Sequence, residues 1–143
     1  SDVVFMKTFI LVAVLATVVT ADFYNTKFEN IDKYTDKYDN INVKEILENR
    51  RLLLAYVDCI MEKEGARCTA EGKELKEHLQ EAMETGCEKC TESQKNGTYT
   101  VIEHLIKNEL DIWNELCAKF DPTGKFRKKY EDLAKEKGIE IPK

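Results

Sequence analysis

The sequence predicts an all-α protein, a compact bundle of about six helices, and three observations support this fold class. Apolar residues recur at spacings of three and four along most of the chain, as they do on the buried face of a helix. Asn or Thr stands where several of these series begin, and glycine stands where several end. No proline occurs between Asp22 and Asp121, and no segment alternates apolar and polar residues as a half-buried strand would.

Length and composition suit one globular domain. The chain has 143 residues, of which 43% are hydrophobic and 34% charged, so it is neither a disordered tail nor a multi-span membrane protein. The formal net charge of −5 argues against nucleic acid as a partner, because binding to a phosphate backbone needs a basic surface.

Residues 1–21 have the layout of a secretory signal peptide preceded by a few upstream residues. A lysine follows the first methionine, then comes an apolar run of about a dozen residues, and Thr20 and Ala21 give a small-residue end. The run is shorter than the roughly 20 residues of a membrane span, so stable membrane insertion is not expected. We predict cleavage after Ala21 and a secreted, extracellular domain formed by residues 22–143.

The first half of this domain is expected to hold an arm and two helices. Residues 22–41 lack clear periodicity and predict an extended or loosely ordered arm. Asn42 and Glu45 fit an N-cap and the third helical position, and Glu48-Asn49 predicts a corner. The next helix is expected to end at Gly65. Its predicted buried stripe is Leu52, Leu53, Tyr56, Val57, Ile60 and Met61.

The second half is expected to hold the remaining helices. Thr69 caps a helix that Gly86 ends, and its apolar stripe is Leu75, Leu79, Ala82 and Met83. Thr91 with Gln94 resembles a capping box.

A long apolar series follows and is expected to break near Asp111. Its members are Val101, Ile102, Leu105, Ile106, Leu110, Trp113, Leu116, Cys117 and Phe120. Residues 121–124, Asp-Pro-Thr-Gly, predict a turn. The last helix carries Phe126 and Tyr130 on its apolar side and is expected to end at Gly138.

The cysteines are Cys59, Cys68, Cys87, Cys90 and Cys117, and the first four follow the pattern C-x8-C-x18-C-x2-C. Disulfides are the default behind a signal peptide, and several pairings are open. Adjacent pairing needs only local folding, and such short loops stabilise by about 2–3 kcal/mol each. In that case apolar packing must hold the helices together.

Other roles for the cysteines fit less well. Zinc binding is disfavoured because secretion favours oxidation and the C-x8-C half is a poor match to zinc-site spacing. A redox role for Cys87 and Cys90 would need a βαβ setting that the sequence lacks. We therefore expect no metal and no cofactor. Cys117 lies on an apolar helical face and is interpreted as a buried thiol, so a monomer is expected; a dimer through Cys117 is the alternative.

No catalytic set appears, so an enzyme is not expected. His78 and His104 are the only histidines, and both are interpreted as ordinary surface or boundary residues. Ser93, the only serine after residue 21, lacks a nucleophile-elbow setting. The chain is instead rich in apolar and aromatic helix surface, which composition alone cannot assign to a filled or a hollow interior.

Several segments together resemble the insect chemosensory protein family. They are the Tyr-Thr-Asp-Lys-Tyr-Asp segment at 34–39, the segment 53–59, the four-cysteine pattern, and the 121–124 turn ahead of Lys128-Lys129-Tyr130. The resemblance covers nearly all of residues 22–143. It implies a small secreted carrier with six helices around an apolar channel and with the pairs Cys59–Cys68 and Cys87–Cys90.

The resemblance also implies where a ligand would lie. Tyr56 would line the channel, Trp113 would lie near its wall, and Tyr38 and Asp39 would lie near its mouth. The full set expected to contact ligand is Tyr38, Asp39, Ile41, Val43, Ile46, Leu47, Tyr56, Val57, Ile60, Leu75, Leu79, Met83, Val101, Leu105, Trp113 and Tyr130. The chain departs from the family pattern in a longer first cysteine loop, in Phe126 where many relatives have tryptophan, and in the additional Cys117.

The leading hypothesis is a non-enzymatic carrier of semiochemicals, fatty alcohols, aldehydes or acids, or other lipids. A dozen methylenes gain roughly 10 kcal/mol on leaving water, and association costs reduce this to about −8 kcal/mol, which is micromolar binding. Tyr38, Asp39 or Tyr56 would receive the polar head group. The alternative is a secreted protein-interaction or developmental factor that uses its acidic surface and the arm 22–41.

Overall fold

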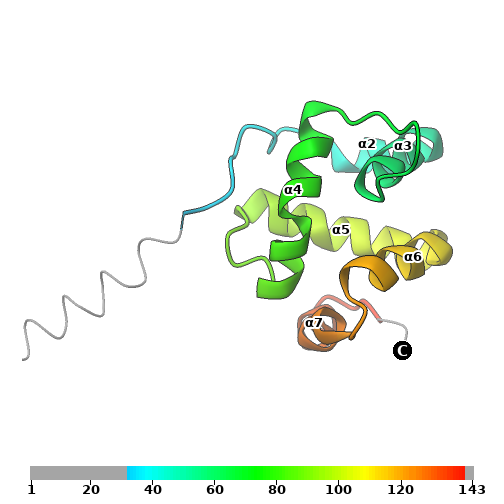
Figure 1. Ribbon diagram of the computed structural model, residues 1–143. Helices are drawn as coiled ribbons and strands as arrows, with labels where there is room; N and C mark the ends of the chain where they lie inside the picture. Colours follow the sequence, from blue (N-terminus) through cyan, green and yellow to red (C-terminus); the bar gives the residue numbers. More distant parts are fainter. Residues whose placement is uncertain (1–31, 141–143) are drawn as a thin grey trace, which may run out of the picture. The chain divides into compact units, whose positions relative to one another are not determined.

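The computed structural model describes residues 32–140 (Figure 1). The predicted signal peptide and its cleavage site lie outside the described residues, as does most of the predicted arm. Residues 33–140 belong to one compact unit. The described residues form helices and no strand, which confirms the predicted all-α class. The helices are α2 (Val43–Glu48), α3 (Arg50–Ile60), α4 (Ala70–Thr85), α5 (Glu92–Asn108), α6 (Leu110–Phe120) and α7 (Lys125–Glu136).

The helix starts follow the capping residues predicted from the sequence. The Asn42 side chain accepts from the backbone of Glu45, and Thr69 caps α4 in the same way. At α5, Thr91 and Gln94 form both hydrogen bonds of a capping box. Asn49, predicted only as part of a corner, also caps α3 through its side chain. These caps satisfy backbone N–H groups that have no partner within the helix.

One predicted helix end was misplaced, and the predicted break in the long apolar series is confirmed. The predicted end of the second helix at Gly65 is wrong, because α3 ends at Ile60. Ending there lets the chain turn back so that Cys68 reaches Cys59, with 5.2 Å between their Cα atoms. The long apolar series breaks at Glu109, two residues before Asp111, which confirms the predicted break near Asp111.

The helices pack around one apolar cluster. α5 and α6 run across the middle of the view in Figure 1, with α2 and α3 on one side and α7 on the other. Contacts join α3 to α2 and α4, α5 to α2 and α6, and α4 to α6 and α7. The buried cluster consists of Leu47, Leu53, Val57, Ile102, Leu105, Ile112, Trp113, Cys117, Phe126, Tyr130, Ala134 and Ile139.

Three leucines predicted in buried series are exposed instead. Leu52 is 37% exposed, and Leu75 and Leu110 are both 44% exposed. Leu52 lies one step around α3 from the buried line of Leu53 and Val57. Leu110 is the first residue of α6, directly after the break, where the change of helix direction alters the face that each position presents.

Two disulfides fasten neighbouring segments. Cys59 pairs with Cys68 and Cys87 with Cys90, at sequence separations of 9 and 3. The pairing is the one that the family resemblance implied. Gly72 of α4 lies against the first bridge: a Cβ atom there would be 3.4 Å from the Cys59 sulfur and 3.2 Å from the Thr69 hydroxyl. The missing side chain therefore lets α4 approach α3 at the bridge.

The segment from Tyr34 to Asp39 is fixed to α4 and α5, so the expectation of loose order is wrong for this part of the arm. The Tyr34 N–H donates to the Lys89 carbonyl at 2.9 Å, and the Tyr34 hydroxyl donates to Glu81 at 2.8 Å. Gln94 donates to the Thr35 carbonyl at 3.0 Å. These are hydrogen bonds between distant segments, which the polar composition of the arm did not reveal.

A buried carboxylate holds the start of α7. Asp121 is only 4% exposed, and its oxygens accept from the backbone N–H groups of Phe126 at 2.9 Å and Arg127 at 3.2 Å. The Arg127 guanidinium donates to the same carboxylate at 3.1 Å. The N-cap position, Gly124, has no side chain with which to cap the helix. Asp121 therefore takes over the capping of α7, a role that the sequence analysis missed because it interpreted 121–124 only as a turn.

Replacing Asp121 with alanine should lower the free energy of unfolding by roughly 2–3 kcal/mol, because two backbone donors and a guanidinium lose a charged acceptor. The measurement is urea unfolding followed by circular dichroism. Asp132→Ala is the matched control, since Asp132 lies on α7 and its side chain is exposed. Equal destabilisation by the two substitutions would show that Asp121 has no special role.

Candidate ligand-binding site

The structure gathers half of the predicted ligand-contacting residues into and around the buried cluster. Those within the cluster are Leu47, Val57, Leu105, Trp113 and Tyr130, and those packed against it are Val43, Met83 and Val101. They come from α2, α3, α4, α5, α6 and α7, so the whole bundle contributes.

The other predicted contacts lie elsewhere. Ile60 is buried but does not belong to this cluster, and Leu75 is exposed. The remaining residues, which are half-buried, are Tyr38, Asp39, Ile41, Ile46, Tyr56 and Leu79. The buried cluster also contains residues that were not predicted to contact ligand, namely Leu53, Ile102, Ile112, Cys117, Phe126, Ala134 and Ile139. Helical spacing had placed most of these on apolar faces, but Ile139 follows the last helix and carries no periodic signal.

An aromatic row lies at the α5–α7 side of the cluster. The Tyr130 ring stacks between Tyr99, at a centroid distance of 5.3 Å, and Phe126, at 5.2 Å. The ammonium of Lys137 lies 4.1 Å from the centroid of the Tyr99 ring, close enough for a cation–π contact. The row combines flat apolar surface with a cation at one end.

The Tyr130 hydroxyl is the most unusual polar group in this row. It is buried and has no hydrogen-bond partner among the described residues. Burial raises the pKa of Tyr130 above its usual range, with a smaller contribution from Tyr99, so the hydroxyl stays protonated. An unpaired buried hydroxyl costs free energy that a hydrogen-bonding guest would recover.

Asp39 presents a second unpaired polar atom. One of its carboxylate oxygens is buried without a partner among the described residues, while its backbone carbonyl accepts from the Ser93 hydroxyl at 3.2 Å. The neighbouring Tyr38 is half-buried, and its ring lies 5.4 Å from the Lys37 ammonium. Asp39 can therefore accept a hydrogen bond from a hydroxyl-bearing molecule.

The Tyr56 hydroxyl already has a partner. It donates to the Glu71 carboxylate at 2.7 Å, joining α3 to α4. Burial, and then this hydrogen bond, raise the pKa of Tyr56. The pKa of Glu71 is lowered by a hydrogen bond from its own backbone N–H and then by the one from Tyr56. The Tyr56 hydroxyl, which was predicted to bind a ligand head group, thus joins two helices by a hydrogen bond in this structure.

Cys117 lies in the cluster as a free, buried thiol, as predicted. Burial raises its pKa, although Arg127 has a smaller opposing effect. An intermolecular disulfide through Cys117 would require its side chain to leave the core.

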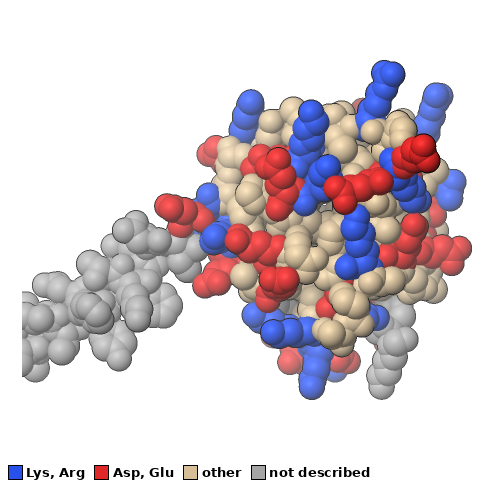
Figure 2. All heavy atoms as spheres, viewed as in Figure 1, with Lys and Arg blue, Asp and Glu red and all other residues tan. Residues whose placement is uncertain are grey.

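The surface carries no single-sign patch on the face drawn in Figure 2, where basic and acidic side chains are intermixed. Among residues 32–140, no helix is long and apolar enough to cross a bilayer.

A helical bundle with a shared apolar interior and a buried, unpaired hydroxyl in it is compatible with binding of a small apolar molecule. The sequence model of the insect pheromone-binding family A10/OS-D matches residues 34–128. The chain belongs to this family, and the resemblance seen in the sequence is confirmed.

Known relatives and solved structures agree with this membership. Allergen Tha p 1 of Thaumetopoea pityocampa is 48% identical over 101 residues, which cover 71% of this chain and 79% of the relative. A chemosensory protein in complex with bromo-dodecanol is 70% identical, with a TM-score of 0.66, covering 71% of this chain and all of that one. Antennal chemosensory protein A6 of the moth Mamestra brassicae is 68% identical, with a TM-score of 0.62, covering 77% of this chain and all of that one.

Replacing Tyr56 with phenylalanine should destabilise the protein by about 1 kcal/mol at neutral pH, and by less in acid. The pKa of Glu71 is lowered from 4.5 by folding, so its stabilising effect is present above that value and is lost as the pH falls through the folded pKa. The difference between the two proteins should therefore narrow below about pH 4.5. Urea unfolding at pH 7 and pH 3 measures this change.

The control for this substitution is Tyr38→Phe, because the Tyr38 hydroxyl makes no hydrogen bond to a described residue. It should show little change at either pH. A Tyr56→Phe effect of constant size at both values would mean that the charge of Glu71 does not contribute.

Proposed function

We propose that this protein is a secreted, non-enzymatic carrier of small long-chain hydrophobic molecules, such as fatty alcohols, aldehydes or acids. The observation that carries the proposal is the unpartnered Tyr130 hydroxyl beside the apolar cluster. An alkyl chain would bind in that interior, and its polar end would hydrogen-bond the hydroxyl. The relative that is found with bromo-dodecanol, a long-chain alcohol, supports this ligand class.

The interior can supply the affinity that such a carrier needs. A twelve-carbon chain removed from water gains roughly 10 kcal/mol, and association costs of about 4 kcal/mol leave net binding of about −6 kcal/mol, which corresponds to tens of micromolar. Apolar contacts without many polar ones give broad selectivity. Met83, half-buried beside the cluster, has the flexible side chain that lets a site adapt to different chains.

Ligand entry would require the interior to open. Close-packed side chains leave no room for a guest without movement, and an empty apolar cavity costs stability. The half-buried residues packed against the cluster, among them Val43, Met83, Tyr99 and Val101, would move first because they are already partly exposed to solvent. Ligand binding would therefore separate helices that are held only by apolar contacts.

Secretion and a monomeric state belong to the same proposal. The two disulfides favour an oxidising compartment, and the burial of Cys117 favours a monomer. The competing hypothesis of a protein-interaction factor is less well supported. It requires a mobile arm, but residues 34–39 of the predicted arm form hydrogen bonds to α4 and α5.

Titration with 12-bromododecanol should quench the fluorescence of Trp113, the only tryptophan. Trp113 is 4% exposed and lies within the cluster, so a bromine atom can come close to it only from inside the bundle. We expect saturation at micromolar concentrations and reversal by unlabelled dodecanol.

Bromoethanol is the control for this titration, because it carries the same heavy atom and hydroxyl but too little apolar surface to bind. Quenching by both compounds alike would indicate collision with an exposed indole. An unchanged signal with 12-bromododecanol, together with no bound alcohol in native mass spectrometry, would overturn the carrier proposal.

Replacing Tyr130 with phenylalanine should stabilise the ligand-free protein by up to about 1 kcal/mol, since an unpaired buried hydroxyl is removed. The same substitution should weaken dodecanol binding by severalfold while leaving binding of dodecane unchanged. Thermal unfolding and competition against a fluorescent fatty-acid probe give the two readouts. Equal losses for alcohol and alkane would show that the hydroxyl does not contact the head group.

A further inference from the structure

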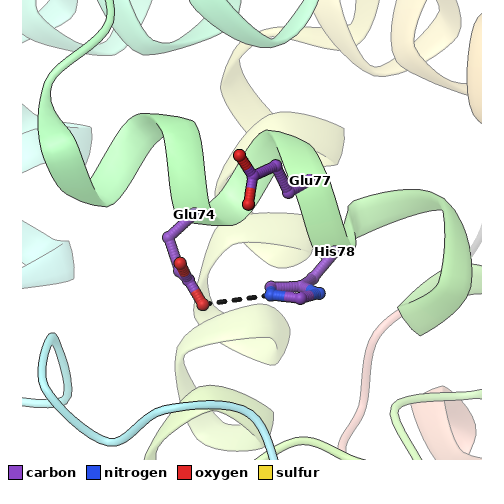
Figure 3. A group of neighbouring side chains, drawn as sticks. All are labelled: Glu74, Glu77 and His78. Atoms are coloured by element: carbon purple, nitrogen blue, oxygen red, sulfur yellow. Dashed lines mark hydrogen bonds and ion pairs between the residues drawn. The ribbon is translucent and has the colours of Figure 1, made fainter.

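The polar face of α4 carries a cluster that the carrier proposal does not use. Glu74, Glu77 and His78 occupy positions i, i+3 and i+4 of this helix, so their side chains project from one side of it. One ligand atom from each lies within 4.8 Å of the other two. Figure 3 shows Glu74 and His78 joined by a contact of 3.0 Å between Oε1 and Nε2, with Glu77 on the same stretch of helix.

The donor set is one imidazole nitrogen and two carboxylates. Imidazole is a good ligand for Zn²⁺, Cu²⁺ and Ni²⁺, whereas Ca²⁺ and Mg²⁺ prefer oxygen alone. Three protein ligands with water at the remaining positions are sufficient for a zinc ion. The three donor atoms already lie together, so small rotations of the side chains would bring them to coordination distance.

The surroundings leave these donors available. The Tyr34 ring stacks on the face of the His78 ring with 4.4 Å between centroids, so it does not cover the nitrogens at the ring edge; Nε2 contacts Glu74, which is itself one of the three donors. Lys76 pairs with Glu62 and Lys89 with Glu81, while Lys73, which stands four residues before Glu77 on α4, forms no ion pair with a described residue. No described lysine or arginine forms an ion pair with Glu74 or Glu77, so a cation would meet uncompensated negative charge.

The geometry points to a surface site for a first-row divalent transition metal ion, formed by Glu74, Glu77 and His78. On binding, the metal ion would lie between Glu74 and His78 and would replace their direct contact. The three ligands are half-buried or exposed and none belongs to the apolar cluster, so this site is separate from the one proposed for the hydrophobic ligand.

Isothermal titration of the tag-free full-length protein with ZnCl₂ tests the site. We expect one Zn²⁺ per chain with a micromolar dissociation constant, and no heat with MgCl₂. His78→Gln, Glu74→Gln and Glu77→Gln should each weaken Zn²⁺ binding by about tenfold or more. His104→Gln is the matched control, because it removes the only other histidine and should leave the affinity unchanged.

Three further measurements accompany the titration. The imidazole nitrogen resonances of His78, and not those of His104, should shift on addition of Zn²⁺. Circular dichroism checks that each variant is folded, and dodecanol binding should be unchanged in His78→Gln. Absence of one-to-one binding at millimolar Zn²⁺, or full affinity in His78→Gln, would overturn the site. Full affinity in Glu74→Gln or Glu77→Gln would refute the three-ligand arrangement.

Discussion

Apolar contacts between helices that are distant in the sequence are the constraint on which this structure depends. Both disulfides close short loops, so they fix local corners and cannot hold one side of the bundle to the other. The same buried side chains that hold the helices together would also have to receive a ligand. Stability and binding are therefore linked: a guest chain must replace the contacts that it displaces, which a long flexible alkyl chain is suited to do.

Polar groups in the interior divide into satisfied and unsatisfied ones, and the two kinds have different roles. Asp121 is buried with all its charge compensated, and it fixes the direction in which α7 leaves the preceding turn. That direction sets where Phe126 and Tyr130 meet the cluster. The paired carboxylate of Asp121, five residues before Phe126, thus helps to determine the position of the unpaired Tyr130 hydroxyl.

Local features of this fold could be predicted from the sequence, and features that depend on distant partners could not. Helix caps such as Thr69 and Thr91 could be predicted because the capping side chain and its backbone partner are three residues apart. The ion pair between Glu109, at the break between α5 and α6, and Arg50, 59 positions earlier, could not be predicted from the sequence. The spacing of apolar residues predicted which face of each helix is buried, but not where that face ends. Leu52 was therefore predicted to be buried although it is exposed. Of the candidate site, the cluster members on long regular stripes were predictable, whereas the missing partner of Tyr130 became visible only in three dimensions.

The buried position of Cys117 has a consequence for how the protein matures. A protein with five cysteines that is oxidised during secretion risks thiol–disulfide exchange, in which the odd thiolate attacks a correct bridge and scrambles the pairing. Exchange requires a deprotonated sulfur with access to a bridge, and packing of α6 into the core removes both conditions. Once α6 has packed into the core, the Cys117 thiol can no longer attack the native disulfides. The packing of α6 therefore also protects the disulfide pairing.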